Sequence, residues 1–195
     1  MEIKLEHPFL FQCHDINELL HDVKKLSTFC TNLENQSIRF PNRYESKKYK
    51  GDGFELFVEA FIKLSPIDNR IAIGNYKPII DGDTGVDGVG VGIDEKIATV
   101  QVKYRSNNET LLTANDKESN LSNFVTASLL RYGVDQNSKT NMLIITTAAG
   151  LHYFTDGEMY QGKVRCLGYE NLRSIVDNNL LFWNAFRNLV KENKI

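Results

Sequence analysis

The feature that most constrains this chain is the alternation of side chains along residues 97–105. Successive side chains of a β-strand point to opposite faces of the sheet. One face would carry apolar or aromatic residues, Val100, Val102 and Tyr104. The other would carry polar residues, Thr99, Gln101, Lys103 and Arg105. A polar face on a central strand is costly unless charged or hydrogen-bonding groups meet it, so this strand predicts a polar site.

A second extended run, residues 81–93, precedes this strand, and the polar turn Asp94-Glu-Lys96 separates the two runs. This order predicts a β-hairpin. If the hairpin folds about Glu95, Asp87 lies directly opposite Lys103 and diagonal to Gln101, with directly opposed Cβ atoms roughly 5 Å apart. The glycines at 88, 90 and 92 leave this register weakly specified, and a one-residue slip would separate the groups.

Helical periodicity and short apolar runs predict the other elements. We expect helices at 15–34, 53–64, 117–132, 169–177 and 180–192, and strands at 71–76, 142–147 and 164–167. Asp15 is the expected cap of the first helix. A polar, basic stretch at 36–52 separates the first two helices and has a solvated loop as its simplest interpretation. The order predicts an α/β domain around one mixed β-sheet, with an N-terminal addition at 1–50 and a core at 51–195 that form one compact unit.

Composition adds limits on the class of protein. The 195 residues carry a net charge of −2, so binding to nucleic acid would need local basic patches rather than an overall positive charge. The three cysteines form no CxxC pair, which favours reduced thiols in a cytosolic protein. Because no apolar run approaches the length of a membrane span, we expect a cytoplasmic protein without a membrane partner, in the host cytoplasm if the chain is viral.

The groups that the predicted hairpin brings together suit the hydrolysis of phosphodiesters. A carboxylate such as that of Asp87 binds Mg²⁺, which prefers oxygen ligands. The metal lowers the pKa of bound water, and an ammonium such as that of Lys103 stabilises negative charge in the transition state. The hairpin therefore predicts a metal-dependent hydrolytic site.

The same residues resemble a known family. Asp87 followed by Gln101-Val-Lys103 looks like the PD-(D/E)XK nuclease motif in the QxK variant of Mrr-like restriction endonucleases, with Val86 where the motif has proline. Gly53-Phe-Glu55 resembles the family's preceding helix, and residues 112–147 resemble nuclease domains attached to some helicases. The resemblance covers roughly residues 50–150 and implies a restriction-endonuclease-like core, here with an N-terminal helical addition. It further implies a Mg²⁺ or Mn²⁺ site formed by Asp87, Gln101, Glu55 and the Val102 carbonyl, with Lys103 as the catalytic lysine.

Several alternatives stay open at this stage. Glu59 lies one helical turn from Glu55 and could replace it at the metal. Asp81 and Asp83 are turn formers or additional metal ligands, and Asp87 with Lys103 could be a structural ion pair. The expected DNA-binding residues are basic: Arg39, Arg43, Lys47, Lys48, Lys50 and Arg105.

The function also has alternatives. The first is a Mg²⁺-dependent endonuclease acting on DNA, with a homodimer as one arrangement for double-strand cutting. The second is a nuclease-fold module that binds DNA or protein without cleavage. The third is a nuclease subunit that is active only with a helicase or restriction-complex partner.

Overall fold

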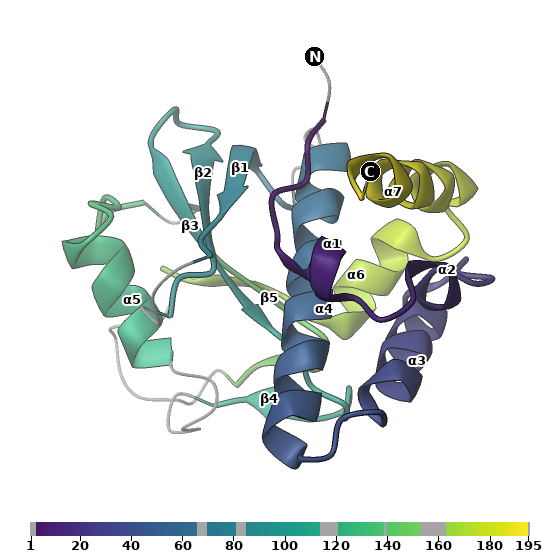
Figure 1. Ribbon diagram of the computed structural model, residues 1–195. Coiled ribbons are helices and arrows are strands. Elements are labelled where there is room, and N and C mark those ends of the chain that lie inside the picture. Colours follow the sequence, from purple (N-terminus) through teal and green to yellow (C-terminus); the bar gives the residue numbers. More distant parts are fainter. Residues whose placement is uncertain are drawn as a thin grey trace.

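A mixed β-sheet of five strands lies at the centre of the molecule, and helices pack on both of its faces (Figure 1). The computed structural model describes residues 3–65, 70–80, 85–113, 121–138, 140–152 and 163–194. The chain is therefore an α/β protein, and the predicted mixed sheet flanked by helices is confirmed. None of the helices in the described ranges has the length and hydrophobicity needed to cross a membrane.

The central sheet has the spatial order β1-β2-β3-β5-β7. Its strands are β1 (Ile73–Pro78), β2 (Gly88–Gly92), β3 (Ile97–Lys103), β5 (Met142–Thr146) and β7 (Arg165–Leu167). The first three form an antiparallel meander, whereas β5 and β7 add in parallel to β3. A separate parallel pair consists of β4 (Leu111–Leu112) and β6 (Gly150–Leu151).

Helix α5 covers one face of the sheet, and α4 crosses the other face with the remaining helices behind it (Figure 1). The helices are α1 (Phe9–Gln12), α2 (Ile16–Leu19), α3 (Leu26–Ser37), α4 (Arg43–Leu64), α5 (Leu121–Leu130), α6 (Tyr169–Val176) and α7 (Leu180–Asn193). The predicted strands after residue 140 and the two C-terminal helices are confirmed to within two residues. Residues 117–120, with which the helix predicted at 117–132 would begin, lie outside the described ranges. Asp81 and Asp83 also lie outside them.

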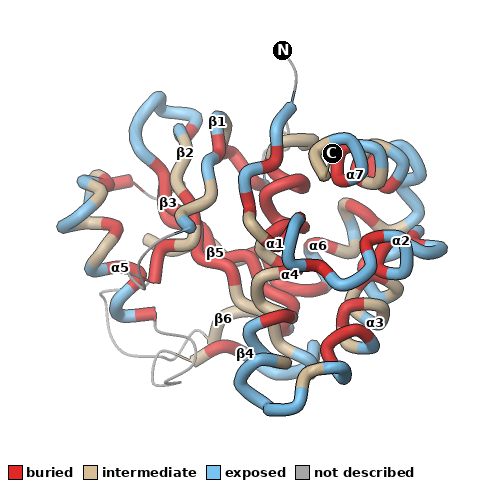
Figure 2. Tube along the Cα trace, viewed as in Figure 1, coloured by how far each residue is buried: buried red, intermediate tan, exposed pale blue. Residues whose placement is uncertain are grey.

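Strand β5 is buried on both faces, which explains its uninterrupted apolar run. Its Leu143 and Ile145 belong to the core shared with α4, whereas Met142 and Ile144 belong to the core shared with α5. Figure 2 shows buried segments in the central strands and in α4. The sheet is thus held between two cores, and its strand ends are the places where polar groups can reach solvent.

The predicted continuous helix at 15–34 is wrong. Helix α2 ends at Leu19, and Asp22 adopts a left-handed conformation with φ of 50° before α3 begins at Leu26. The break is held by distant groups, since the Leu26 amide donates to the Asp177 carboxylate at 2.8 Å. The periodic apolar residues are buried on both sides of the break, so the pattern was real although the helix was not continuous.

The interpretation of residues 36–52 as a loop is also wrong for most of its length, because α4 begins at Arg43 rather than at Gly53. The Asn42 side chain caps the helix by accepting a hydrogen bond from the Glu45 amide at 2.8 Å. Gly53 lies inside α4, where a Cβ atom would come within 2.5 Å of Leu33 on α3. The division at residue 50 therefore falls within one helix, and residues on both sides of it contribute to one core.

The predicted hairpin forms, but its register differs from the prediction by two residues. Val89 pairs with Thr99 and Val91 with Ile97. The turn closes through a hydrogen bond from the Gly92 amide to the Lys96 carbonyl. A two-residue shift preserves the alternation, so each side chain keeps the face that the sequence predicts.

Candidate active site

An open cavity of about 570 Å³ lies between the N-terminal half of α4 and the end of β3. It is lined by Tyr44, Lys47, Lys48, Lys50, Gly51, Glu55, Val102, Lys103, Tyr104, Arg105 and Ser106. Five of these residues are cationic, and Glu55 is the acidic residue among them. A concave surface with this charge attracts polyanions despite the net charge of −2.

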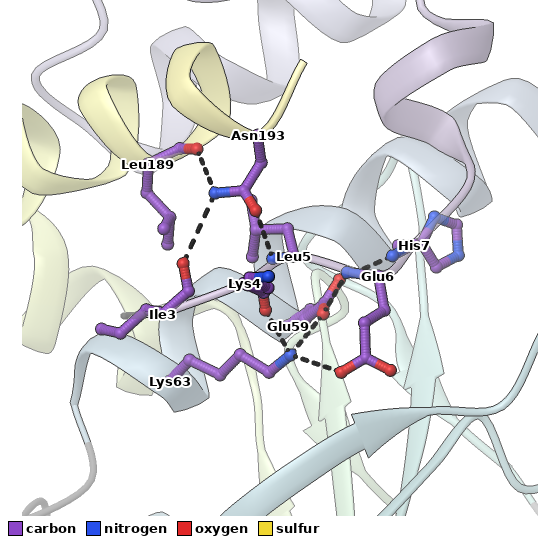
Figure 3. Close-up of polar contacts among 9 residues, drawn as sticks. All are labelled: Ile3, Lys4, Leu5, Glu6, His7, Glu59, Lys63, Leu189 and Asn193. Atoms are coloured by element: carbon purple, nitrogen blue, oxygen red, sulfur yellow. Dashed lines mark hydrogen bonds and ion pairs between the residues drawn. The ribbon is translucent and has the colours of Figure 1, made fainter. Parts of the chain in front are cut away.

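The cavity contains Glu55, whereas Glu59 is buried one turn further along α4. Both oxygens of Glu59 are engaged (Figure 3). Oε1 accepts from the Glu6 amide and the Lys63 ammonium, each at 2.7 Å, and Oε2 accepts from the His7 amide at 3.0 Å. Glu59 is thus a structural carboxylate, and Glu55 is the helix acid that a ligand in the cavity can meet.

Glu55 has a partner that the sequence did not indicate. Its Oε2 lies 3.0 Å from Nε2 of His7, whose side chain is only 6% exposed. His7 stands on an N-terminal segment almost fifty positions away in sequence, so no local motif could have linked the two residues. An isolated histidine before a helix was the only available signal.

Asp87 is fixed to the backbone of β3 just before β2 begins. Its amide donates to the Val100 carbonyl at 2.9 Å, and its Oδ2 accepts from the Val102 amide at 2.6 Å. The carboxylate therefore meets the peptide bond between Gln101 and Val102 instead of lying directly opposite Lys103. Val102 and Lys103 line the cavity, so this hydrogen bond connects Asp87 to the cavity wall.

Gln101 is fully buried and points away from the core that Val100 and Val102 share with α4. Its Nε2 donates to the Gly85 carbonyl at 2.9 Å. Its Oε1 has no hydrogen-bond donor in the part of the chain that the structure describes. A buried oxygen without a donor is uncommon and suggests an additional ligand. The Gln101 side chain is not among the groups that line the cavity.

Tyr76 connects the two sides of this region electrostatically. It is buried on β1, and its ring packs so closely on Gly88 that a Cβ atom there would lie 2.2 Å from the hydroxyl. Burial raises the pKa of Tyr76 well above its usual value, and the charges of Asp87, Glu55 and Glu59 raise it further. The charges of Asp87 and Glu55 therefore both act on the Tyr76 hydroxyl.

The expected metal ligands are all oxygen donors: two carboxylates, one amide and one backbone carbonyl. Such a set suits Mg²⁺ or Mn²⁺. The unpartnered Oε1 of Gln101 fits this role, since a cation would satisfy it. In the described ranges, no group of three or more His, Cys, Asp or Glu side chains is placed to hold a metal ion. A metal site here would therefore depend on Gln101 and the backbone as well as on Asp87 and Glu55.

Four of the six expected DNA-binding residues line the cavity, Lys47, Lys48, Lys50 and Arg105. Arg39 instead forms an ion pair with Glu18 at 2.6 Å, and Arg43 is exposed at the start of α4 without lining the cavity. The helical conformation of residues 43–52 places the lysines along the same wall as Glu55.

Glu34 of α3 closes the far end of this wall. It accepts hydrogen bonds from Lys50 at 2.9 Å, Tyr104 at 2.8 Å and Ser106 at 2.5 Å. Burial alone would raise the pKa of Glu34, yet the hydrogen bonds from Ser106, Lys50 and Tyr104 hold it below its usual value. Lys50 is therefore part of the fixed wall, because its ammonium is already paired with Glu34.

A smaller cavity of about 330 Å³ continues from this point and shares Tyr104, Arg105 and Ser106 with the first.

Comparison of the chain with family models, with characterised proteins and with solved structures gave no match. The interpretation of the site therefore depends on its own residues and geometry.

Proposed function

We propose that this protein is a Mg²⁺- or Mn²⁺-dependent nuclease that hydrolyses DNA phosphodiester bonds. The observation that carries this proposal is the hydrogen bond from the Val102 amide to Asp87. Asp87 is not itself among the residues that line the basic cavity, but this bond joins its carboxylate to Val102, which lines the cavity together with Glu55 and Lys103. Acidic groups beside a concentration of cations are what the cleavage of a polyanion requires, since the cations hold the substrate and the acids bind the metal.

The residues of the site have separate roles in this reaction. Lys47, Lys48 and Arg105 bind substrate phosphates along the cavity, and this attraction does not depend on sequence. Asp87, Gln101, Glu55 and the Val102 carbonyl would hold the cation. When bound there, Mg²⁺ or Mn²⁺ would neutralise charge on the phosphate and lower the pKa of a water molecule. Lys103 lines the same cavity and places an ammonium where negative charge develops on the phosphate.

The mixed sheet with helices on both faces supports a restriction-endonuclease-like fold, with α1–α3 as the N-terminal helical addition. In this proposal DNA is the substrate and the protein acts in the cytoplasm. A homodimer would supply two sites for double-strand cutting, and a helicase or restriction-complex partner would supply specificity.

A second function is favoured by two observations taken together. The described residues hold no preformed group of three acidic or histidine metal ligands, although the cavity is strongly basic. These two facts together suit a domain that binds nucleic acid without cutting it. Metal-independent DNA binding without cleavage is the property that distinguishes this alternative.

The test uses the intact chain, supercoiled plasmid and either Mg²⁺ or Mn²⁺. We expect the wild type to nick or linearise the plasmid and Asp87→Ala to abolish cleavage, while thermal melting shows that the variant is folded. Glu95→Gln is the matched control, because Glu95 is an exposed acid in the turn of the same hairpin. Cleavage by Asp87→Ala at the wild-type rate would refute the site. DNA binding without cleavage by the wild type in both metals would establish the binding module instead.

A further inference from the structure

The N-terminal segment before α1 is fastened to two helices (Figure 3). The Lys63 ammonium donates to the Lys4 carbonyl at 2.7 Å, and the Leu5 amide donates to Asn193 of α7 at 2.9 Å. Glu59 accepts from the next two amides, as described above. Each residue from Lys4 to His7 therefore has its backbone held by a side chain of α4 or α7, and the Cα of His7 has a fixed position.

The ring of His7 is oriented by a second contact. Its Nδ1 lies 3.3 Å from the Phe9 amide, which can only donate. Nδ1 must therefore present its lone pair, which places the ring hydrogen on Nε2. Nε2 then donates to Oε2 of Glu55 at 3.0 Å. The backbone and the ring of one residue thus hold two glutamates of α4, Glu59 through the amide and Glu55 through the imidazole.

We propose that His7 is the positioning residue for Glu55, and this inference rests on the nuclease function proposed above. Glu55 is 26% exposed beside a cavity with five cationic residues, so an unrestrained carboxylate could turn toward a lysine instead of a metal ion. The hydrogen bond from His7 restrains Oε2, and no described residue donates to Oε1, which can meet a ligand. Groups that orient a ligand in this way commonly change metal affinity by about 10- to 100-fold when they are lost.

A purely structural role makes a different prediction. If His7 only fills space and completes the packing of the N-terminal segment, its removal would lower thermal stability without a specific effect on metal binding. The two roles can be separated because Gln at position 7 keeps a donor for Glu55, whereas Leu does not. Leu also lacks an acceptor for the Phe9 amide, whereas the carbonyl oxygen of Gln retains one, so the comparison in a Glu55→Ala background is needed to isolate the contact with Glu55.

The experiment measures Mn²⁺ affinity by isothermal titration calorimetry, plasmid cleavage against Mn²⁺ concentration, and thermal melting. We expect His7→Leu to weaken Mn²⁺ binding by about tenfold or more and His7→Gln to recover most of that loss. His21→Leu is the matched control, since the His21 side chain is 78% exposed and its ring lies beside Asp22 rather than Glu55. We also expect His7→Leu to have no further effect on Mn²⁺ affinity when Glu55 is already alanine.

The outcomes separate this inference from the function on which it rests. Equal losses of affinity in His7→Leu and His7→Gln would overturn the positioning role, as would a His7→Leu effect that persists in the Glu55→Ala background. Unchanged Mn²⁺ affinity in His7→Leu, with normal binding by the wild type, would overturn the inference while leaving the nuclease proposal intact. Absence of Mn²⁺ binding and cleavage by the wild type would overturn both.

Discussion

Replacement of Glu59 by alanine should be among the most destabilising changes in the N-terminal part of this protein. Glu59 is fully buried, and its carboxylate accepts three hydrogen bonds, from Lys63 and from the amides of Glu6 and His7. Hydrogen bonds to a charged group contribute about 1.5–3 kcal/mol each to folding stability, but such contributions are not additive. Removal of one partner of a buried ion pair costs about 3–5 kcal/mol when the other charge is left uncompensated. Lys63 keeps a second acidic partner, Glu6 at 3.2 Å, which favours the lower end of that range.

The structure also sets an upper limit on this loss. The N-terminal segment can detach from α4 and return Lys63 and the two amides to water, at the expense of the buried side chains of Leu5 and His7. We therefore expect a loss of about 3–4 kcal/mol in the free energy of unfolding. For a protein of this size, that loss corresponds to a fall in Tm of about 10 °C.

Glu55→Ala is the matched control for this prediction, since it removes the same side chain one turn earlier on the same helix. Glu55 is partly exposed, and within the described ranges it accepts one hydrogen bond, from His7, which water can replace. We expect its loss to lower stability by about 1 kcal/mol. Urea denaturation followed by circular dichroism gives both values, and hydrogen exchange reports detachment of the segment. Equal stability of the two variants would show that the Glu59 contacts do not hold this segment.

Three further predictions concern the cavity and the hairpin. Lys103→Ala should slow cleavage by about 100-fold or more under single-turnover conditions, with little change in DNA affinity. A large loss of DNA affinity at a normal cleavage rate would instead make Lys103 a binding residue. Neutralising Lys47 and Lys48 together should lower the log–log salt slope of DNA binding by up to about 1.8, measured by fluorescence anisotropy, whereas an unchanged slope would exclude both from phosphate contact. Gly88→Ala should lower the free energy of unfolding by about 1–3 kcal/mol in urea, because the new Cβ meets the Tyr76 hydroxyl, and a loss under about 0.5 kcal/mol would contradict this packing.

The salt-slope measurement needs a control for the general effect of charge. Lys77 on β1 and Lys191 on α7 are exposed and do not line the cavity, so their double replacement removes the same net charge elsewhere. Lys48 also pairs with an acid, Asp52, but its side chain is 57% exposed and can turn toward a phosphate. Lys50 is unsuitable for this comparison, because its side chain is only 13% exposed and its loss would leave Glu34 without its cationic partner.

Strand β3 and the face of each of its residues could be predicted from the sequence, because a period of two fixes which side chains share a face. The pairing register between β2 and β3 could not be predicted. Gly88, Gly90 and Gly92 lack side chains that could distinguish one pairing from the next, and the turn closes between Gly92 and Lys96 instead of folding symmetrically about Glu95. The error was an even number of residues, so Asp87 still met the Gln101–Lys103 segment, though through the backbone of Val102.

The start of α4 was missed for a different reason. Its first turns are rich in Lys and Arg, which are good helix formers, but few of their residues are buried, so no apolar stripe marks this part of the helix. Gly51 and Gly53 then suggested a boundary. At Gly53 the absence of a side chain instead allows Leu33 to pack against the helix. A glycine inside a helix can therefore mark a close contact between helices as well as a helix end.

The choice between Glu55 and Glu59 shows why sequence alone could not complete the site. The two residues have the same chemistry and lie one turn apart on the same helix, so neither propensity nor periodicity separates them. What separates them is His7, whose backbone amide binds one carboxylate and whose ring binds the other. The N-terminal segment therefore determines that Glu59 is a buried structural carboxylate and that Glu55 meets the cavity. If the protein is a nuclease, a truncation that removes residues 1–8 should therefore impair the site as well as the fold, although the DNA-facing lysines would all remain.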